Sequence, residues 1–286
     1  MERYSRVYET VNLDAIRQNM EAMRANLKEG TEMIGVVKAD GYGHGSVPVA
    51  CAIDSYVSGY ATATPEAVIL RKHGITKPIL ILGVSPESSF SQLIEYDLRP
   101  AIFRYESAAR LSELAVQAGK RASIHIALDT GMSRIGYPVT AAAAEETARI
   151  SRLPGIRIEG LFTHFARADE KDKAATDRQM ELFTTFVSML SERGVTIPVL
   201  HCSNSAGILE LPKANFNAVR AGISIYGLFP SDEVEKEPVR LISAMELKST
   251  ITYLKTIAPG TPVSYGGTFT AERETSIATI PVGYGD

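Results

Sequence analysis

A lysine near the start of the chain stands between a short apolar run and a glycine-rich segment. Lys38 follows Val36 and Val37 directly, and the stretch Gly41–Gly45 holds three glycines in five positions. Burial at the end of a strand is costly for an ammonium group and favours the neutral amine, which attacks carbonyl carbon atoms. The glycines permit close backbone approach to a ligand. Lys38 is therefore a candidate for covalent catalysis, although a side chain that extends into solvent fits the same position.

A second group of small and polar residues lies late in the chain, in the segments HCSNS and VRAGISIYG. The backbone N–H groups of Gly222 and Ile223 are suited to bind a phosphate, and the hydroxyl of Ser205 is suited to donate to the same group. Each feature is weak by itself. Their meaning depends on whether the fold brings them to Lys38.

The elements that position these residues are eight short apolar runs that alternate with helical patterns. One helical pattern, Asp177–Ser191, places apolar side chains at spacings of three and four. Continuous apolar strands are typical of a parallel sheet covered by helices. Eight units in about 210 residues predict a (β/α)8 barrel of the TIM type, with a doubly wound sheet as the alternative. The expected strands are Met33–Lys38, Tyr56–Ala61, Pro78–Gly83, Arg99–Phe103, Ser123–Leu128, Ile156–Thr163, Val199–Cys202 and Phe216–Val219.

In such a barrel the loops after the carboxyl ends of the strands build the active site, and phosphates commonly bind after strands seven and eight. Lys38 ends the first expected strand, whereas Ser205 and Gly222 follow the seventh and eighth. A lysine on strand one opposite a phosphate site at strands seven and eight is the arrangement expected for pyridoxal phosphate held as a Schiff base.

Composition excludes several other classes of protein. Hydrophobic residues make up 45% of the 286, and 30 Lys+Arg against 33 Asp+Glu give a net charge of −3. A charge that small argues against sequence-independent binding to nucleic acid or to an anionic membrane. The first residues lack a secretory signal, no apolar run approaches membrane-spanning length, and Cys51 and Cys202 are isolated. We expect a cytoplasmic protein.

After the barrel the pattern changes. Ser231–Arg240 is charged and predicts a linker, and Ser243–Leu254 alternates as one strand of an antiparallel β domain. We expect a barrel over residues 11–235 and a second domain over 236–286 that is incomplete in this chain.

Six motifs, in order along nearly the whole chain, closely resemble those of alanine racemases: VVKADGYGHG, DTGMSRIG, GLFTHFARADE, HCSNSAG, NAVRAGISIYG and VSYGGTFT. The resemblance implies a pyridoxal 5′-phosphate enzyme of fold type III that racemises alanine for cell-wall peptidoglycan and acts as a homodimer. It also implies that residues 1–10 form a strand of the β domain and that family members continue for roughly another hundred residues.

The resemblance also implies a role for each matching residue. Lys38 would bind the cofactor and serve as an acid–base group on one face, and Tyr265 from the partner subunit would serve the opposite face. Arg220 would face the pyridine nitrogen, His164 would hydrogen-bond to Arg220 and to the catalytic tyrosine, and Arg134 would lie near the substrate carboxylate. The phosphate would be held by Tyr42, Ser205, Gly222, Ile223 and Tyr226.

The chain departs from the family pattern at Ala127, where many members carry a carbamylated lysine that supports the arginine corresponding to Arg134. An unpaired, partly buried guanidinium is costly. We therefore expect a small anion such as chloride, or a nearby Asp or Glu, beside Arg134.

Other interpretations remain open at this point. His164 and Asp169 lack a second histidine at metal-site spacing, so no metal is expected. His125 is expected to be a satisfied barrel residue. Rival functions on the same barrel are a non-catalytic pyridoxal-phosphate carrier, a racemase for another small amino acid such as serine, and an amino-acid decarboxylase.

Overall fold

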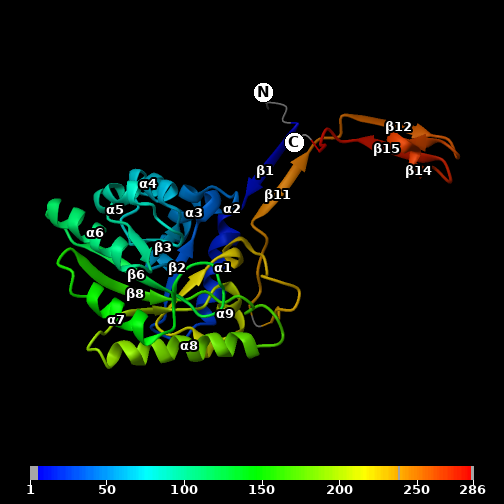
Figure 1. Ribbon diagram of the computed structural model, residues 1–286. Helices are drawn as coiled ribbons and strands as arrows, with labels where there is room; N and C mark the ends of the chain where they lie inside the picture. Colours follow the sequence, from blue (N-terminus) through cyan, green and yellow to red (C-terminus); the bar gives the residue numbers. More distant parts are fainter. Residues whose placement is uncertain (1–5, 238, 285–286) are drawn as a thin grey trace. The chain divides into compact units, whose positions relative to one another are not determined.

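The computed structural model describes residues 6–237 and 239–284 of the chain. It contains two compact units (Figure 1). Residues up to Asn12 join those from Met245 onward in a β unit, and Leu13–Ala244 form a barrel unit. The expected division into 11–235 and 236–286 lies close to this one, and the expected strand at residues 1–10 falls partly outside the described residues.

The barrel unit is built on a nine-stranded sheet, in which β7 (Tyr137–Pro138) is a short addition beside β6. The other strands are parallel, and pairing between β5 and β6 closes them into a cylinder. The barrel prediction is therefore confirmed, because a doubly wound sheet would leave two free edges. In their order around the barrel the strands are β5 (Arg99–Ile102), β4 (Ile79–Ile81), β3 (Gly59–Thr62), β2 (Glu32–Val36), β10 (Ala218–Ala221), β9 (Val199–His201), β8 (Ile156–Phe162) and β6 (Ala122–Asp129).

Helices surround the strands of the barrel unit (Figure 1). The expected helix Asp177–Ser191 is confirmed and begins slightly earlier, at Ala174; it buries Phe183, Phe186 and Leu190. The helices are α1 (Leu13–Ala25), α2 (Lys38–Tyr42), α3 (Ser46–Ile53), α4 (Thr64–Lys72), α5 (Phe90–Glu95), α6 (Tyr105–Gln117), α7 (Ala141–Ile150), α8 (Ala174–Ser191) and α9 (Ser205–Glu210).

The strands are buried on both faces, as parallel strands covered by helices require. All residues of β3 and β5 are buried, and β6 is buried from Ala122 to Leu128. Side-chain caps then fix where individual helices begin. Thr140 accepts a hydrogen bond from Ala143 N at the start of α7, and Asn204 accepts one from Gly207 N at the start of α9.

The β unit consists of antiparallel strand pairs. β1 (Val7–Val11) pairs with β11 (Met245–Ser249), and β12 (Tyr253–Ile257) pairs with β15 (Thr275–Thr279). A third pair joins β13 (Pro262–Val263) to β14 (Phe269–Thr270). The expected antiparallel β segment is confirmed, but it is not continuous over Ser243–Leu254: β11 pairs with β1, and after a break β12 pairs with β15.

Within the described residues, no helix combines the length and the apolar character that crossing a membrane requires.

Two glycines of the barrel unit share a backbone conformation but differ in their surroundings. Comparing them distinguishes the cost of the conformation from the cost of a steric clash. Gly227 (φ +87°) and Gly74 (φ +89°) both lie in the left-handed region. A Cβ atom at Gly227 would lie 1.9 Å from the carbonyl oxygen of Ile242, whereas one at Gly74 would meet nothing within 4 Å.

We predict that Gly74→Ala lowers the free energy of unfolding by about 1–2 kcal/mol, the cost of the left-handed conformation. Gly227→Ala is expected to lose about 1–3 kcal/mol more, because the backbone at Ile242 must move. Urea unfolding of the two variants measures the difference. Equal losses would show that the segment at Ile242 is not held against Gly227.

Candidate active site

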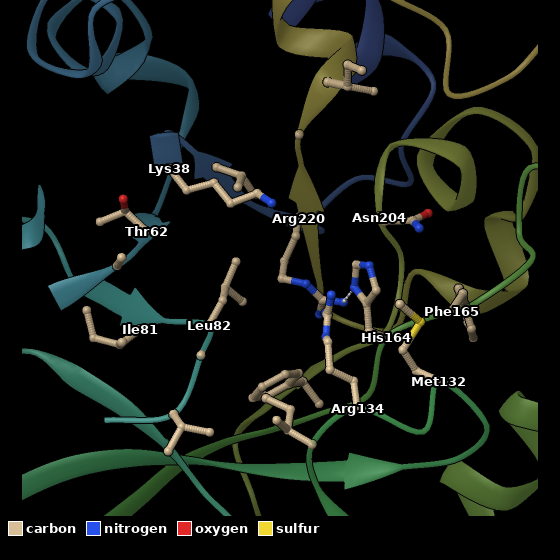
Figure 2. Close-up of a pocket in the computed structure, with 18 of the residues that line it drawn as sticks. Lys38, Thr62, Ile81, Leu82, Met132, Arg134, His164, Phe165, Asn204 and Arg220 are labelled. Carbon is tan, nitrogen blue, oxygen red and sulfur yellow. Dashed lines mark hydrogen bonds between the residues drawn. The ribbon is translucent and has the colours of Figure 1, made fainter. Parts of the chain in front are cut away.

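A cavity of about 930 Å³ opens at the carboxyl ends of the barrel strands (Figure 2). All of its lining residues belong to the barrel unit. The sequence-predicted site residues among them are Lys38, Tyr42, Arg134, His164, Ser205, Arg220, Gly222 and Ile223. Tyr226 is not part of the lining, and Tyr265 belongs to the β unit.

Lys38 begins a turn of left-handed helix that directly follows β2. Ala39, Asp40 and Gly41 have φ/ψ of 51°/51°, 50°/50° and 62°/41°, and Tyr42 has φ 54°. Each non-glycine residue in this conformation costs about 1–2 kcal/mol. Such a turn persists only where surrounding groups hold it in place.

The carboxylate of Glu66, on α4, supplies much of that support. It accepts hydrogen bonds from Asp40 N at 2.9 Å and from Ala63 N at 3.3 Å, and a third from the hydroxyl of Thr62. On the other side of the turn, Asp40 Oδ1 accepts from Ser46 N at 2.7 Å. The strained turn is thus tied to both β3 and α3.

The Lys38 side chain extends into the cavity (Figure 2) and is exposed. Of the two alternatives for this position, the side chain that extends into solvent is the one observed: the lysine lies beyond the buried residues of β2, at the mouth of the barrel. Its nearest aromatic neighbour is Tyr42, whose ring centroid lies 5.4 Å from Nζ.

Ser205 and Gly222 form a small cradle on the wall of the cavity. Ser205 Oγ accepts hydrogen bonds from Gly222 N at 3.0 Å and Ser224 N at 3.3 Å, which leaves its own proton to donate. A Cβ atom on Gly222 would lie 3.5 Å from both Ser205 Oγ and Tyr42 Oη, in the space between the two hydroxyls. The absence of a side chain at Gly222 keeps that space open, and the hydroxyls around it fit a phosphate group.

Tyr226 supports this cradle from behind. It is 1% exposed, and its hydroxyl donates to Val36 O at 3.0 Å; burial raises its pKa. Its ring lies 5.0 Å from that of Tyr42. The one proton of its hydroxyl is thus donated to the end of β2. The contact between Tyr226 and a phosphate stays a prediction.

Arg220 lies on the floor of the cavity and is only 2% exposed. Nη1 donates to His201 Nδ1 at 2.6 Å and to His201 O at 3.0 Å. Nη2 donates to Thr163 O and Cys202 O at 2.8 and 2.9 Å. It also donates to His164 Nδ1 at 3.2 Å (Figure 2). Burial lowers the pKa of Arg220 to about 10, so the group stays charged at neutral pH. Among the described residues, nothing accepts a hydrogen bond from Nε.

His164 makes the hydrogen bond to Arg220 that was expected. Burial, followed by the charges of Arg220, Arg134 and Lys38, lowers the pKa of His164 to about 3. The imidazole is therefore neutral at pH 7, and Nδ1 accepts from the guanidinium, which leaves the proton on Nε2.

Ala127 lies in an apolar environment. It is 1% exposed and packs with Ala101 and Phe162, and Phe103 packs against this cluster. Arg134 is exposed and pairs with no carboxylate of the described residues. The expectation of a partly buried Arg134 beside an Asp or Glu is therefore wrong, because water hydrates the guanidinium and no internal partner is required. A bound anion there stays a prediction.

Sequence reasoning missed Gln179 on α8, which holds two loops of the site together. Its Nε2 donates to Thr130 Oγ1 at 3.0 Å and to His164 O at 3.1 Å, and its Oε1 accepts from Ala166 N at 2.9 Å. The available signal was a polar residue on the apolar face of the helix, four positions before Phe183. Glu66 gave no comparable signal.

Tyr265 lies in a short 3-10 turn of the β unit, Tyr265–Gly267, and its side chain is 95% exposed. Its hydroxyl makes no hydrogen bond within the described part of the chain. The barrel cavity and this tyrosine are thus contributed by different units of one chain.

The chain is similar to a set of known proteins over almost its full length. Residues 11–230 match the family described as "Alanine racemase, N-terminal domain", and residues 244–286 match "Alanine racemase, C-terminal domain". The alanine racemase of Desulforamulus reducens is 41% identical over 282 residues, which cover 98% of this chain and 76% of the relative. Alanine racemase 1 of Clostridium acetobutylicum is 44% identical over 98% of this chain and 73% of its own length.

Solved structures agree with these sequence matches. An alanine racemase of Clostridium difficile 630 superposes with a TM-score of 0.93 at 39% identity and covers all of this chain and 75% of its own. A complex of that racemase with cycloserine gives a TM-score of 0.89 at 37% identity, again over all of this chain and 75% of its own.

The left-handed turn offers a direct test of the site geometry. We predict that Glu66→Ala increases the amide exchange rate at Asp40 by about 5- to 150-fold, because a hydrogen bond to a carboxylate is worth about 1–3 kcal/mol. Hydrogen exchange followed by NMR measures the rate. Glu87→Ala, at an exposed position, is the matched control. Unchanged exchange at Asp40 in Glu66→Ala would show that the turn does not depend on this carboxylate.

Proposed function

The chain belongs to the alanine racemase family, and from this premise we propose that it interconverts L-alanine and D-alanine with pyridoxal 5′-phosphate bound in the barrel cavity. The reaction would supply D-alanine for peptidoglycan in the cytoplasm. The observation that carries the proposal is that Lys38, the cradle of Ser205 and Gly222, and the unpartnered Nε of buried Arg220 line one cavity.

Residues of the barrel unit would hold the cofactor at three points. Lys38 Nζ would bind it covalently. Arg220 Nε would donate to the pyridine nitrogen, a role supported by the five hydrogen bonds that orient its other two nitrogen atoms. The phosphate would be held by Tyr42, Ser205, Gly222 and Ile223, with Tyr226 behind them.

When bound, pyridoxal phosphate withdraws electron density from the substrate and makes the proton on Cα acidic. An arginine does not readily give up a proton to a ring nitrogen. Arg220 would therefore leave that nitrogen unprotonated, which would moderate the electron withdrawal and disfavour transamination as a side reaction.

Racemisation requires a proton to leave one face of Cα and another to arrive on the opposite face. One group fixed on a single side cannot do both, so two acid–base groups are needed. Lys38 Nζ serves one face and Tyr265 Oη the other. A tyrosine acts as a base at neutral pH only beside cationic groups, and Arg134, Arg220 and Lys38 supply positive charge at the cavity.

The remaining roles follow from charge and exposure. Arg134 lines the cavity and is exposed, which suits a guanidinium that receives the carboxylate of an incoming amino acid. Tyr265 is exposed and unpartnered in the β unit, which suits a residue that completes the cavity of a second copy. The active form is therefore a two-fold homodimer, in which each subunit lends its tyrosine to the other.

The test is the formation of D-alanine from L-alanine by the chain with pyridoxal phosphate, followed by chiral chromatography. Lys38→Ala is expected to abolish both racemisation and the absorbance band of the covalently held cofactor. Tyr265→Phe is expected to keep the band and to lower the rate by about 10²–10⁴-fold, the usual effect of losing one acid–base group.

Co-expression of the two variants tests whether the tyrosine acts across the dimer. A mixed dimer has one site with both Lys38 and Tyr265, so about a quarter of all sites in a random mixture are complete. Recovery of about that fraction of the activity supports the shared site. No recovery would place Tyr265 in its own subunit's site.

The same assay separates the rival functions. Cofactor binding without racemisation of any amino acid would indicate a carrier protein, and release of carbon dioxide would indicate a decarboxylase. Faster racemisation of serine than of alanine would keep the mechanism and change the substrate. Each of these results would overturn the proposal of an alanine racemase.

A further inference from the structure

Three buried or half-buried titratable groups that the proposed reaction does not use form a chain behind Arg220. His201 Nε2 lies 2.8 Å from His125 Nδ1, and His125 Nε2 lies 3.8 Å from Glu159 Oε2. His201 is 0% exposed and His125 is 5% exposed. Arg220 lies on β10, His201 on β9, Glu159 on β8 and His125 on β6. These four strands are neighbours in that order around the barrel.

The direction of every proton in this chain follows from its first member. A guanidinium has only donors, so His201 Nδ1, at 2.6 Å from Arg220 Nη1, must accept. A neutral His201 then carries its proton on Nε2 and donates to His125 Nδ1. His125 in turn carries its proton on Nε2, which faces the carboxylate of Glu159.

The charges around the chain agree with this assignment. Burial, then the charges of Arg220 and His125, keeps the pKa of His201 well below its ordinary value. Burial lowers the pKa of His125. Glu159 raises this pKa, whereas the charges of Arg99 and Arg220 lower it further.

Glu159 is held as an anion at the far end. Its contact with His125, and then with Arg99, lowers its pKa to about 2 in spite of burial. Arg99 Nε lies 3.1 Å from Oε2, and Arg157 Nη2 lies 2.7 Å from Oε1. Arg220 makes no ion pair with a carboxylate among the described residues. The carboxylate of Glu159 lies just beyond its hydrogen-bond chain, at 3.8 Å from His125 Nε2, which is longer than a hydrogen bond.

The local backbone is shaped to admit the two imidazoles. The register of β6 against β8 shifts between Ile124 and His125, an irregularity that redirects side chains. A Cβ atom on Gly160 of β8 would lie 2.3 Å from His125 Nδ1, so only glycine fits there. The ring of Phe162 stacks on that of His201 at 5.1 Å and 12°.

We propose that His125 and Glu159 are positioning residues of the active site: through His201 they fix the orientation of Arg220, with Nη1 held from behind and Nε left facing the cavity. The catalytic consequence rests on the proposed function, because it is there that Arg220 Nε contacts the cofactor. The hydrogen-bond chain itself is a property of the protein without cofactor.

The first readout needs neither cofactor nor activity. The chain contains five histidines, so selective ¹⁵N labelling gives few signals to assign. In the cofactor-free protein we expect both His125 and His201 to be neutral and protonated on Nε2 at pH 7, and to titrate below the range of ordinary histidines. A charged His201, or a proton on its Nδ1, would overturn the proposal.

Two substitutions at the far end isolate the role of Glu159. Glu159→Gln removes the charge and keeps the size, and it is expected to shift the ¹⁵N signals of both histidines. Asp97→Asn is the matched control, because Asp97 pairs with the same Arg99 at 2.7 Å and makes no contact with either imidazole in the hydrogen bonds and ion pairs of the described residues. Equal spectra for Glu159→Gln and the wild type would overturn the role of Glu159.

The second readout is catalytic. His125→Leu leaves His201 Nε2 without an acceptor and is expected to lower kcat and the affinity for pyridoxal phosphate by about 10- to 100-fold. His125→Gln keeps an acceptor and is expected to restore most of both, which a purely structural role would not predict. Circular dichroism shows whether His125→Leu folds. If it does not, kcat and the affinity for pyridoxal phosphate are compared between His125→Gln, Glu159→Gln and the control Asp97→Asn.

The two readouts also separate this inference from the proposed function. Expected histidine signals in a wild-type protein that does not racemise amino acids would overturn the racemase and leave the hydrogen-bond chain supported. Full racemase activity in Glu159→Gln and His125→Leu would overturn the positioning role and leave the racemase supported.

Discussion

A guanidinium that is 2% exposed and lacks a carboxylate partner among the described residues is the constraint around which the cavity is organised. A buried charge is tolerated only when its donors are fully satisfied. Arg220 meets this condition at Nη1 and Nη2, and not at Nε, with neutral acceptors alone: three backbone carbonyls and two imidazoles, from β9 and from the residues that follow β8 and β9. The demand for acceptors forces both imidazoles to stay neutral, and it orients the one remaining N–H toward the cavity.

The same kind of long-range hydrogen bond shapes the loops of the site. The barrel positions the ends of the strands, but it does not determine the path of the chain beyond them. Glu66 stabilises the left-handed turn after Lys38, and Gln179 joins the loops that carry Arg134 and His164. Each uses a half-buried or buried polar side chain from a surrounding helix. The hydrogen bond of Glu66 to Asp40 N is exposed, whereas that of Gln179 to Thr130 is buried and hence worth more than at the surface.

The sequence was sufficient to predict the barrel and the convergence of Lys38, Ser205, Arg220 and Gly222, because apolar runs repeat along the chain and a parallel barrel gathers the ends of its strands on one side. It was not sufficient for features that depend on contacts between distant residues. The left-handed turn, the apolar packing around Ala127, the exposure of Lys38 and the break between β11 and β12 are of this kind. His125 was expected to be merely satisfied; only the pairing of β6 with β8, and of β8 with β9, reveals its partners.

The central claim is that burial and the positive charge of Arg220 together keep the imidazoles around this guanidinium neutral, and an NMR titration of His164 tests it most directly. Free histidine titrates near pH 6.5. In the wild-type chain the pKa of His164 is expected to be about 3, so its signals stay those of a neutral ring as the pH falls through 6 and 5. Arg220→Gln removes the second-largest cause of that shift and is expected to move the titration to higher pH, although burial still keeps it below the ordinary value. A wild-type His164 that is charged at pH 6, or a titration that does not move in Arg220→Gln, would contradict the account.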